Sequence, residues 1–213
     1  MDIVNYLSQI YGTGTPIFLK DVRIGGKSKT AIKEAFYRAY KRGEIEKTKN
    51  GVYFIKKKQE FGGGINFTSI IEKKFIYSDG MYEVEAIRNL FVEGYYSGLI
   101  FLNMIGLSQQ VPAILEITTN KTSSKKRYYT SGKSIAIIRK ARTAVTFQNY
   151  KILQFLDMFH FISMDEVMDN KELLKNYVKE NGFSKTDFSK YIGLYGTQTI
   201  KKIVEGGIID AFK

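Results

Sequence analysis

The hydrophobic and polar positions between Lys29 and Arg42 follow a helical period. Apolar side chains recur at three- and four-residue intervals, which predicts one buried stripe of Ile32, Ala35, Phe36, Ala39 and Tyr40. Ser28 precedes this run as an N-cap, and Gly43 ends it because glycine tolerates the left-handed backbone that follows many helices. The opposite side is predicted to face solvent and carries Lys29, Thr30, Lys33, Tyr37 and Lys41.

Two β-prone segments, residues 44–48 and 52–57, follow this helix directly. They are separated by Asn50-Gly51, the dipeptide that best fits the positive φ angles of a type I′ hairpin turn. A helix with a basic outer face followed by a basic hairpin is typical of a winged helix-turn-helix.

The residues that precede this helix complete the same pattern. Residues 2–11 predict a first helix with Ile3, Tyr6, Leu7 and Ile10 on one face. Residues 17–19 predict a short strand, and residues 20–24 predict a brief second helix that Gly25-Gly26 breaks. Helix, strand, helix, turn, helix and hairpin occur in the order that a winged helix-turn-helix requires.

Residues 61–64, Phe-Gly-Gly-Gly, predict a domain boundary because consecutive glycines disfavour regular structure. The predicted domains are residues 1–60 and 65–213. A helix is expected at residues 65–75, and the next elements are a helix at 99–105 and strands at 113–119, 127–130 and 134–139. Further helices are expected at residues 149–162, 166–181, 185–192 and 197–204. The predicted class is α+β, with a mixed α/β part to about residue 142 and a helical part over residues 149–213.

The net charge and its distribution along the chain indicate what kind of molecule the protein binds. The 213 residues carry a formal net charge of +12. Residues 1–60 hold 13 Lys or Arg and 6 Asp or Glu, a net of +7, whereas residues 61–213 hold 20 and 15, a net of +5. The net charge, concentrated around the helix and hairpin, favours a polyanionic partner, nucleic acid before membrane. The first ten residues lack the pattern of a signal peptide and no run is long enough to span a membrane, so a cytoplasmic protein is expected.

Contacts with DNA are assigned by position along this segment. The helix is expected to face the major groove with Ser28, Lys29, Thr30, Lys33 and Tyr37. The hairpin is expected to meet phosphate or the minor groove with Lys47, Lys49 and Asn50.

A second basic run extends from Lys121 to Arg142 with no acidic residue in it. It is either a solvated hairpin or a second contact with nucleic acid or a partner protein, for which the candidates are Lys125, Lys126, Arg127, Lys133 and Arg139. Tyr128 and Tyr129 lie within the run and could stack on bases, which makes RNA the alternative partner.

Groups for catalysis or metal binding are scarce. His160 is the single histidine, it lies in an apolar run, and cysteine is absent, which excludes the common zinc sites. A metal-dependent nuclease would need a lysine at the position of Thr118 after Glu116, and Asp79 is the one plausible upstream acid. A binding protein with no enzymatic activity, no cofactor and no metal is predicted.

Three segments of the C-terminal part resemble a known family. They are Gly94-Tyr95-Tyr96-Ser97-Gly98-Leu99, then Asn103-x-x-Gly106-Leu107-Ser108-x-Gln110-Val111-Pro112, and then Glu116-Ile117-Thr118-Thr119-Asn120. Together they are similar to the AbiEi-type antitoxins of abortive-infection (type IV) toxin–antitoxin systems, and the resemblance extends loosely from the N-terminus to about residue 155. It implies an N-terminal domain that binds inverted repeats in its own promoter and represses transcription. It also implies a C-terminal domain that counters a nucleotidyltransferase-type toxin, with or without a stable complex.

The alternative is an ordinary winged-helix transcription regulator. Its C-terminal domain would sense a ligand or form a dimer. A neighbouring nucleotidyltransferase gene would favour the antitoxin over this alternative.

Overall fold

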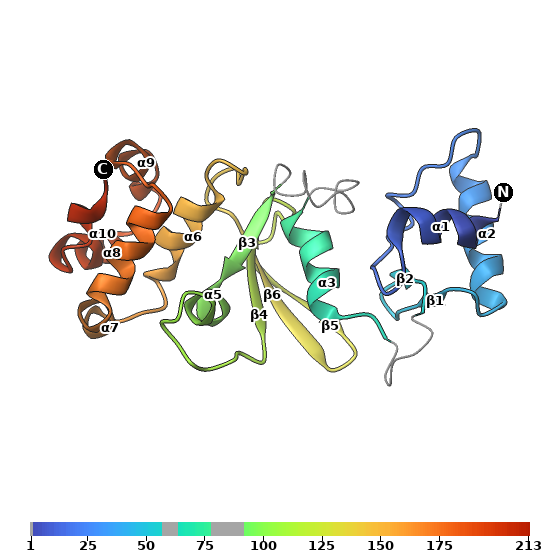
Figure 1. The fold of residues 1–213 in the computed structure, drawn as a ribbon, viewed down its shortest axis with the longest axis horizontal. Coiled ribbons are helices and arrows are strands. Elements are labelled where there is room, and N and C mark those ends of the chain that lie inside the picture. Colours follow the sequence, from blue (N-terminus) through green and yellow to red (C-terminus); the bar gives the residue numbers. More distant parts are fainter. Residues whose placement is uncertain (1, 57–63, 78–91) are drawn as a thin grey trace. The chain divides into compact units, whose positions relative to one another are not determined.

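The structure is a computed structural model that describes residues 2–56, 64–77 and 92–213. In these residues the fold mixes helices with a two-stranded and a four-stranded sheet (Figure 1). The predicted α+β class is therefore confirmed. No helix in the described ranges has both the length and the apolar character of a membrane span.

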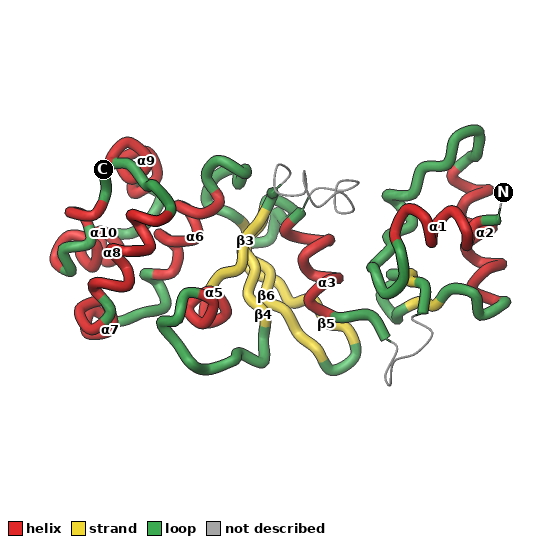
Figure 2. Tube along the Cα trace, in the orientation of Figure 1, coloured by secondary structure: helices red, strands yellow, loops and turns green. Residues whose placement is uncertain are grey.

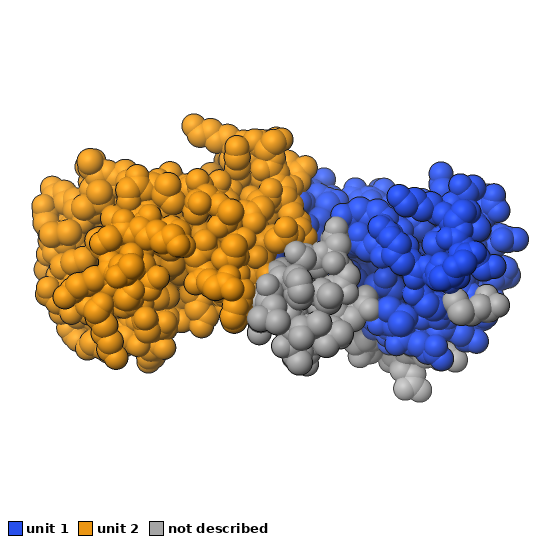
Figure 3. All heavy atoms as spheres, turned by 90° about the horizontal axis from the view of Figure 1, so that it is seen from above, with its two compact units in different colours: residues 1–91, 129–135 blue, residues 92–128, 136–213 orange. Residues whose placement is uncertain are grey.

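The chain divides into two compact units, shown in different colours in Figure 3. The N-terminal unit comprises residues 1–91 and 129–135, and the C-terminal unit comprises residues 92–128 and 136–213. Of the boundary expected at residues 61–64, all but Gly64 lies outside the described residues. Residues 64–77, which the sequence assigned to the second domain, group with the N-terminal unit.

Two helices build the core of the N-terminal unit. Helix α1, Ile3–Tyr11, is preceded by the N-cap Asp2, whose side chain accepts a hydrogen bond from the backbone N–H of Val4. Helix α2, Lys29–Lys41, buries Ile32, Phe36 and Ala39 against α1 and the hairpin. The stripe predicted for α2 is confirmed except at its last residue, since Tyr40 is 42% exposed.

Two expectations between the start of α1 and α2 are wrong. Ile10 was expected on the buried face, but it lies in the last turn of α1 and is 43% exposed. Residues 20–24 form no helix; a single turn is present, in which the N–H of Asp21 donates to the carbonyl of Phe18. The Arg23 guanidinium donates to the carbonyls of Lys20 and Val22, and the carbonyl of Lys20 is the one that the N–H of Ile24 would need in a helix.

The hairpin that follows α2 has strands β1, Glu46–Lys47, and β2, Tyr53–Phe54. The predicted first strand is present as one antiparallel bridge between Ile17 and Tyr53. The predicted type I′ turn is wrong. Such a turn needs positive φ at both Asn50 and Gly51, but among the described residues only glycines have positive φ, and Gly51 has φ of 75°. The N–H of Gly51 donates to the carbonyl of Thr48, so the three-residue loop is a type I turn followed by a left-handed glycine.

A further helix and a strand turn complete the N-terminal unit. Helix α3, Phe67–Ile71, continues as the π-helical turn η1, Glu72–Ile76, which matches the helix expected at residues 65–75. The apolar cluster of Phe18, Val52 and Ile70 has Ile65 and Tyr129 packed against it. The ring of Tyr129 also stacks on Phe67 with 6.2 Å between ring centres.

The larger sheet has the strand order β3-β4-β6-β5. Its strands are β3, Gly94–Ser97, β4, Leu115–Thr119, β5, Lys126–Ser131, and β6, Ser134–Lys140. Strand β4 pairs with β3 antiparallel and with β6 parallel. The tip of the β5–β6 hairpin, residues 129–135, groups with the N-terminal unit, and the rest of the sheet belongs to the C-terminal unit.

Helices make up most of the C-terminal unit outside the sheet (Figure 2). Helix α5, Gly98–Met104, and helix α6, Tyr150–Met158, pack against β3. Then follow α7, Met164–Asp169, α8, Lys171–Glu180, α9, Lys185–Ile192, α10, Thr197–Glu205, and the 3-10 turn η3, Ile209–Ala211. The single helix expected over residues 166–181 is broken at Asn170, whose side-chain amide donates to the carbonyl of Glu166.

Aromatic side chains fill the core of this helical region. Phe155 of α6 has its ring centre within 5.4 Å of Phe159 and 5.5 Å of Tyr177, and Phe183 and Phe212 complete the cluster. Burial raises the pKa of Tyr177 to about 12, since the phenolate would lose hydration. The C-terminal end of the chain is part of this core.

Candidate functional site

The outer face of α2 carries the side chains assigned to the major groove. Lys29, Thr30, Lys33 and Tyr37 are all exposed, and their positions on the helix lie opposite the buried stripe. The hydroxyl oxygen of Ser28 accepts the N–H of Ala31 at 3.2 Å, so Ser28 also fixes where the helix begins. The predicted basic face is therefore formed by one continuous helix.

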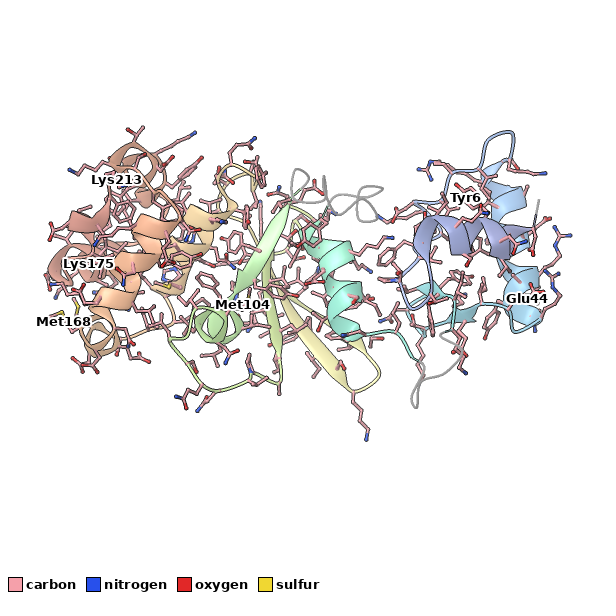
Figure 4. The ribbon with its side chains drawn as sticks, viewed as in Figure 1. Tyr6, Glu44, Met104, Met168, Lys175 and Lys213 are labelled. Carbon is pink, nitrogen blue, oxygen red and sulfur yellow. The ribbon has the colours of Figure 1, made fainter. Side chains whose placement is uncertain are left out.

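The segment before α2 adds charge that the sequence reading left out. A cavity of about 430 Å³ is lined by Leu19, Lys20, Val22, Arg23, Lys29, Ile32 and Lys33. Lys20 and Arg23 reach it from the segment that stands in place of the predicted second helix. The phenol of Tyr6 in α1 donates to the carbonyl of Arg23 at 2.7 Å and holds this segment (Figure 4).

The hairpin presents lysines at its exposed end. Lys47 and Lys49 are exposed, and the ammonium of Lys47 lies 5.3 Å from the ring centre of Tyr53. The Asn50 amide donates to the carbonyl of Thr130, within the N-terminal unit. The Asn50 side chain, which the sequence assigned to phosphate or the minor groove, is thus bonded to the tip of the β5–β6 hairpin. Arg42, at the end of α2, instead forms two hydrogen bonds with Glu44, at 2.9 and 2.8 Å (Figure 4).

The members of the second basic run differ in how far they are exposed. Lys125, Lys126, Arg127 and Lys133 are exposed, whereas Arg139 is half-buried. Tyr128 is 63% exposed, but Tyr129 packs against α3 and lies 4.4 Å from the ammonium of Lys74. Because its ring already contacts protein on more than one side, Tyr129 is not placed to stack on bases.

The resemblance segments meet at the paired strands β3 and β4. Ser97 lies opposite Glu116 in the antiparallel register, and Gly98 follows with φ of 63°. A Cβ atom on Gly98 would lie 2.9 Å from Cδ of Glu116. Glu116 itself accepts two hydrogen bonds from the Arg139 guanidinium, at 3.1 and 2.9 Å. Glycine at position 98 therefore leaves room for this pair.

Two asparagines of the three resemblance segments fix the positions of neighbouring loops through hydrogen bonds to the backbone. The Asn103 amide donates to the carbonyl of Ser108 at 3.0 Å and closes the turn after α5. Asn120 makes two hydrogen bonds with the backbone of Val145, at 2.8 and 2.9 Å, and ties the end of β4 to the segment before α6. Val111, in contrast, is 86% exposed.

A buried polar network connects β4 with α6. Thr118 Oγ1 lies 3.1 Å from Ser97 Oγ and 3.3 Å from Asp157 Oδ2. Burial raises the pKa of Asp157, and the opposing effects of Arg142 and His160 are smaller. Burial also raises the pKa of both Tyr95 and Tyr195, which adjoin Asp157.

Arg142 connects this network to solvent. Its guanidinium Nε lies 3.8 Å from Asp157 Oδ1, its NH1 donates to the carbonyl of Leu194, and its NH2 bonds to Nε2 of His160. Burial and the positive charge of Arg142 lower the pKa of His160, which favours the neutral form of its imidazole. Sequence reasoning missed this constellation because its members are far apart in the chain and no motif joins them.

Features that a metal or nuclease site would need are not assembled in the described ranges. No three His, Asp or Glu residues there lie close enough to hold a metal ion. Glu116 is bonded to Arg139, and Asp79 lies outside the described residues.

Comparisons of the chain with protein-family profiles, with curated proteins and with solved structures find no match.

Proposed function

We propose that this protein binds duplex DNA through its N-terminal unit and represses transcription from its own promoter, as the antitoxin of a type IV toxin–antitoxin system. The observation that carries the DNA-binding part is the exposed face of α2 with Lys29, Thr30 and Lys33, followed at once by a hairpin with Lys47 and Lys49. Cations on a helix and an adjacent hairpin can contact phosphates on both sides of one groove.

A winged helix-turn-helix is the arrangement that we propose for residues 2–56. Helix α2 would enter the major groove, and the three-stranded set formed by Ile17, β1 and β2 would be the wing. The turn at residues 19–21 would take the place of the usual second helix, held by Tyr6 and Arg23. Because this turn also brings Lys20 and Arg23 beside α2, it would add phosphate contacts.

The antitoxin assignment is supported by the resemblance segments. Their residues organise the strands and loops of one unit, where Ser97 and Thr118 reach Asp157 and Glu116 reaches Arg139. The proposed partner of this unit is a nucleotidyltransferase-type toxin whose gene would neighbour that of this protein. Both proteins would act in the cytoplasm. RNA remains the alternative partner for the exposed Lys125, Lys126 and Arg127.

The experiment compares binding to promoter DNA with binding to random DNA. Alanine at Lys29, Thr30 and Lys33 should reduce discrimination between the two, with each lost base contact costing about 1–3 kcal/mol. Fluorescence anisotropy at fixed salt measures both affinities.

The chain offers a matched control for this variant. Helix α9 also begins with Ser-Lys-Thr, at Ser184, Lys185 and Thr186, and carries an exposed Lys190. Alanine at Lys185, Thr186 and Lys190 removes the same groups and should leave discrimination unchanged. Equal loss on both DNAs in the α2 variant would mean that these side chains position the protein without reading bases.

An ordinary regulator with a ligand-sensing C-terminal unit is the second candidate. It is favoured by a basic cavity in that unit, whose lining includes Lys125, Arg139 and Lys140. An adjacent nucleotidyltransferase gene, and rescue of cells that express its product, would favour the antitoxin.

A further inference from the structure

A cavity of about 560 Å³ opens in the C-terminal unit beside the polar network. Its lining comprises Thr118, Ser123, Lys125, Arg139, Lys140, Ala141, Arg142, Asp157, His160 and Phe161. All of these residues belong to the C-terminal unit. The volume is within the range of pockets that bind cofactor-sized molecules and is too small to enclose a duplex.

The sheet topology places this cavity at the ends of two parallel strands. In β4 and β6, Thr118 pairs with Arg139 and Thr119 pairs with Lys140, so both strands finish at the same edge. In open α/β sheets, ligands bind outside the carboxyl ends of the parallel strands, and the cavity has the corresponding position at the parallel pair of β4 and β6. The C-terminal end of α6 supplies Asp157, and the following turn supplies His160 and Phe161.

Positive charge is concentrated at this edge. The N–H of Lys140 donates to the carbonyl of Lys125 at 3.5 Å, so these lysines are cross-strand neighbours at the open end of the β5–β6 hairpin. Like charges in directly opposed positions destabilise a sheet. In the described part of the chain neither ammonium forms an ion pair, whereas Arg139 is bonded to Glu116 and Arg142 lies near Asp157. The two lysines therefore offer charge that the fold itself does not neutralise.

The lining also provides uncharged groups suited to a nucleotide. The hydroxyl of Ser123 can donate to phosphate oxygens. Phe161 is half-buried, with the Arg139 guanidinium 6.0 Å from its ring centre, and it presents an aromatic side chain beside the cations. A phosphate on the lysines and a planar base near Phe161 would use both parts of the cavity.

We infer that this cavity binds a nucleotide, with its phosphates held by Lys125 and Lys140. The site is separate from the proposed DNA contacts on α2, and the inference stands whether or not the chain is an antitoxin. Bound nucleotide would neutralise the opposed lysines and stabilise the C-terminal unit.

The experiment is calorimetric titration of the full-length protein with ATP, with GTP and with inorganic phosphate. Glutamine at both Lys125 and Lys140 should weaken nucleotide binding by about tenfold or more, because charge-assisted contacts with phosphate are lost. The control is glutamine at both Lys126 and Lys133, which lie on the same hairpin, are exposed and do not line the cavity. This control makes the same change in net charge and should retain the affinity within about twofold.

The outcomes separate the inference from its competitors. Binding of ATP or GTP that the cavity variant loses and the control keeps would support it. Equal losses in both variants would show diffuse attraction and overturn it. Absence of nucleotide binding would also overturn it, including the case in which a single-stranded RNA oligonucleotide binds and the cavity variant alone weakens that binding. Circular dichroism of each variant checks that the fold is retained.

Discussion

Gly98 shows how one residue couples backbone geometry to an ion pair. Its φ is 63°, and a Cβ there would lie 2.9 Å from Cδ of Glu116, which bonds to Arg139. We expect Gly98→Ala to lower the free energy of unfolding by about 2–4 kcal/mol, of which about 1–2 kcal/mol is the left-handed backbone and the rest is the displaced pair. Urea denaturation of the full chain measures the change.

Gly132→Ala is the matched control for this substitution. Gly132 has φ of 61°, but nothing lies within 4 Å of its Cβ position. It should cost only the backbone part, about 1–2 kcal/mol. In a Glu116→Ala background, Gly98→Ala should cost no more than Gly132→Ala does. An undiminished cost in that background would show that the Glu116 contact is not the cause.

Asp157 predicts a pH dependence of stability. Because burial raises its pKa above the ordinary value of 3.8, the folded state binds the proton more tightly than the unfolded state does. Its contribution to stability is therefore largest at low pH and is lost as the pH rises through the folded pKa. Asp157→Asn cannot titrate, so its stability relative to the native protein should rise between about pH 4 and pH 7. Urea midpoints across this range test the prediction, and a constant difference would contradict it.

At the scale of elements, the sequence predicted structure that follows from a repeating apolar pattern. It did not predict where other hydrogen bonds replace the expected backbone bonds. The apolar spacing in α2 specifies one buried face, and this helix occurs where expected. Strand β4 lies within the expected residues 113–119, but its last three residues are all buried and show no alternation. The helix predicted at residues 20–24 is absent, and the Arg23 side chain takes the carbonyl oxygen of Lys20 that such a helix would use, which periodicity cannot reveal. The type I′ turn predicted at Asn50-Gly51 is absent because the N–H of Thr48 donates to the carbonyl of Val52, which leaves three residues in the loop, and only Gly51 has positive φ.

The lysines of the β1–β2 hairpin lead to a prediction about the salt dependence of DNA binding. Each phosphate neutralised by a lysine contributes about −0.9 to the slope of log affinity against log salt. Alanine at Lys47 and Lys49 should therefore flatten the slope by about 1.8 and weaken all sequences alike. Alanine at Lys185 and Lys190 is the control that should leave the slope unchanged. An unaltered slope in the hairpin variant would place these lysines away from the DNA backbone.

At the scale of the molecule, the contacts that define the two compact units could not be predicted from the sequence. The triple glycine suggested a division near residue 64, but Ile70 and Tyr129 belong to an apolar cluster with Phe18 and Val52. Contacts between residues so distant in the chain leave no local signal. The same holds for Asp157, Arg142 and His160, whose side chains meet only after β4, α6 and the intervening loop are in place.

The apolar cluster of Phe18, Val52 and Ile70 determines how the separate roles proposed for the two parts of the chain, promoter repression and rescue from the toxin, should be tested. A cut near residue 60 would expose Phe18 and Val52 on one fragment and Ile70 on the other, so a loss of function could reflect unfolding. Point variants of the full chain avoid this problem. Glutamate at Lys29 and Lys33 should abolish promoter repression and retain rescue of cells that express the toxin, because both residues are exposed and lie on α2.

The reciprocal variant completes the test. Glutamate at Lys125, Lys126 and Arg127 reverses charge on an exposed segment of the C-terminal part of the chain. If the partner in rescue is RNA or an acidic surface of the toxin, this variant should lose rescue and retain at least part of promoter repression, because the α2 face is intact. A promoter–reporter assay and a growth assay in the same strain measure the two activities. Parallel loss of both activities in both variants, with the protein folded, would show that repression and rescue depend on one shared surface.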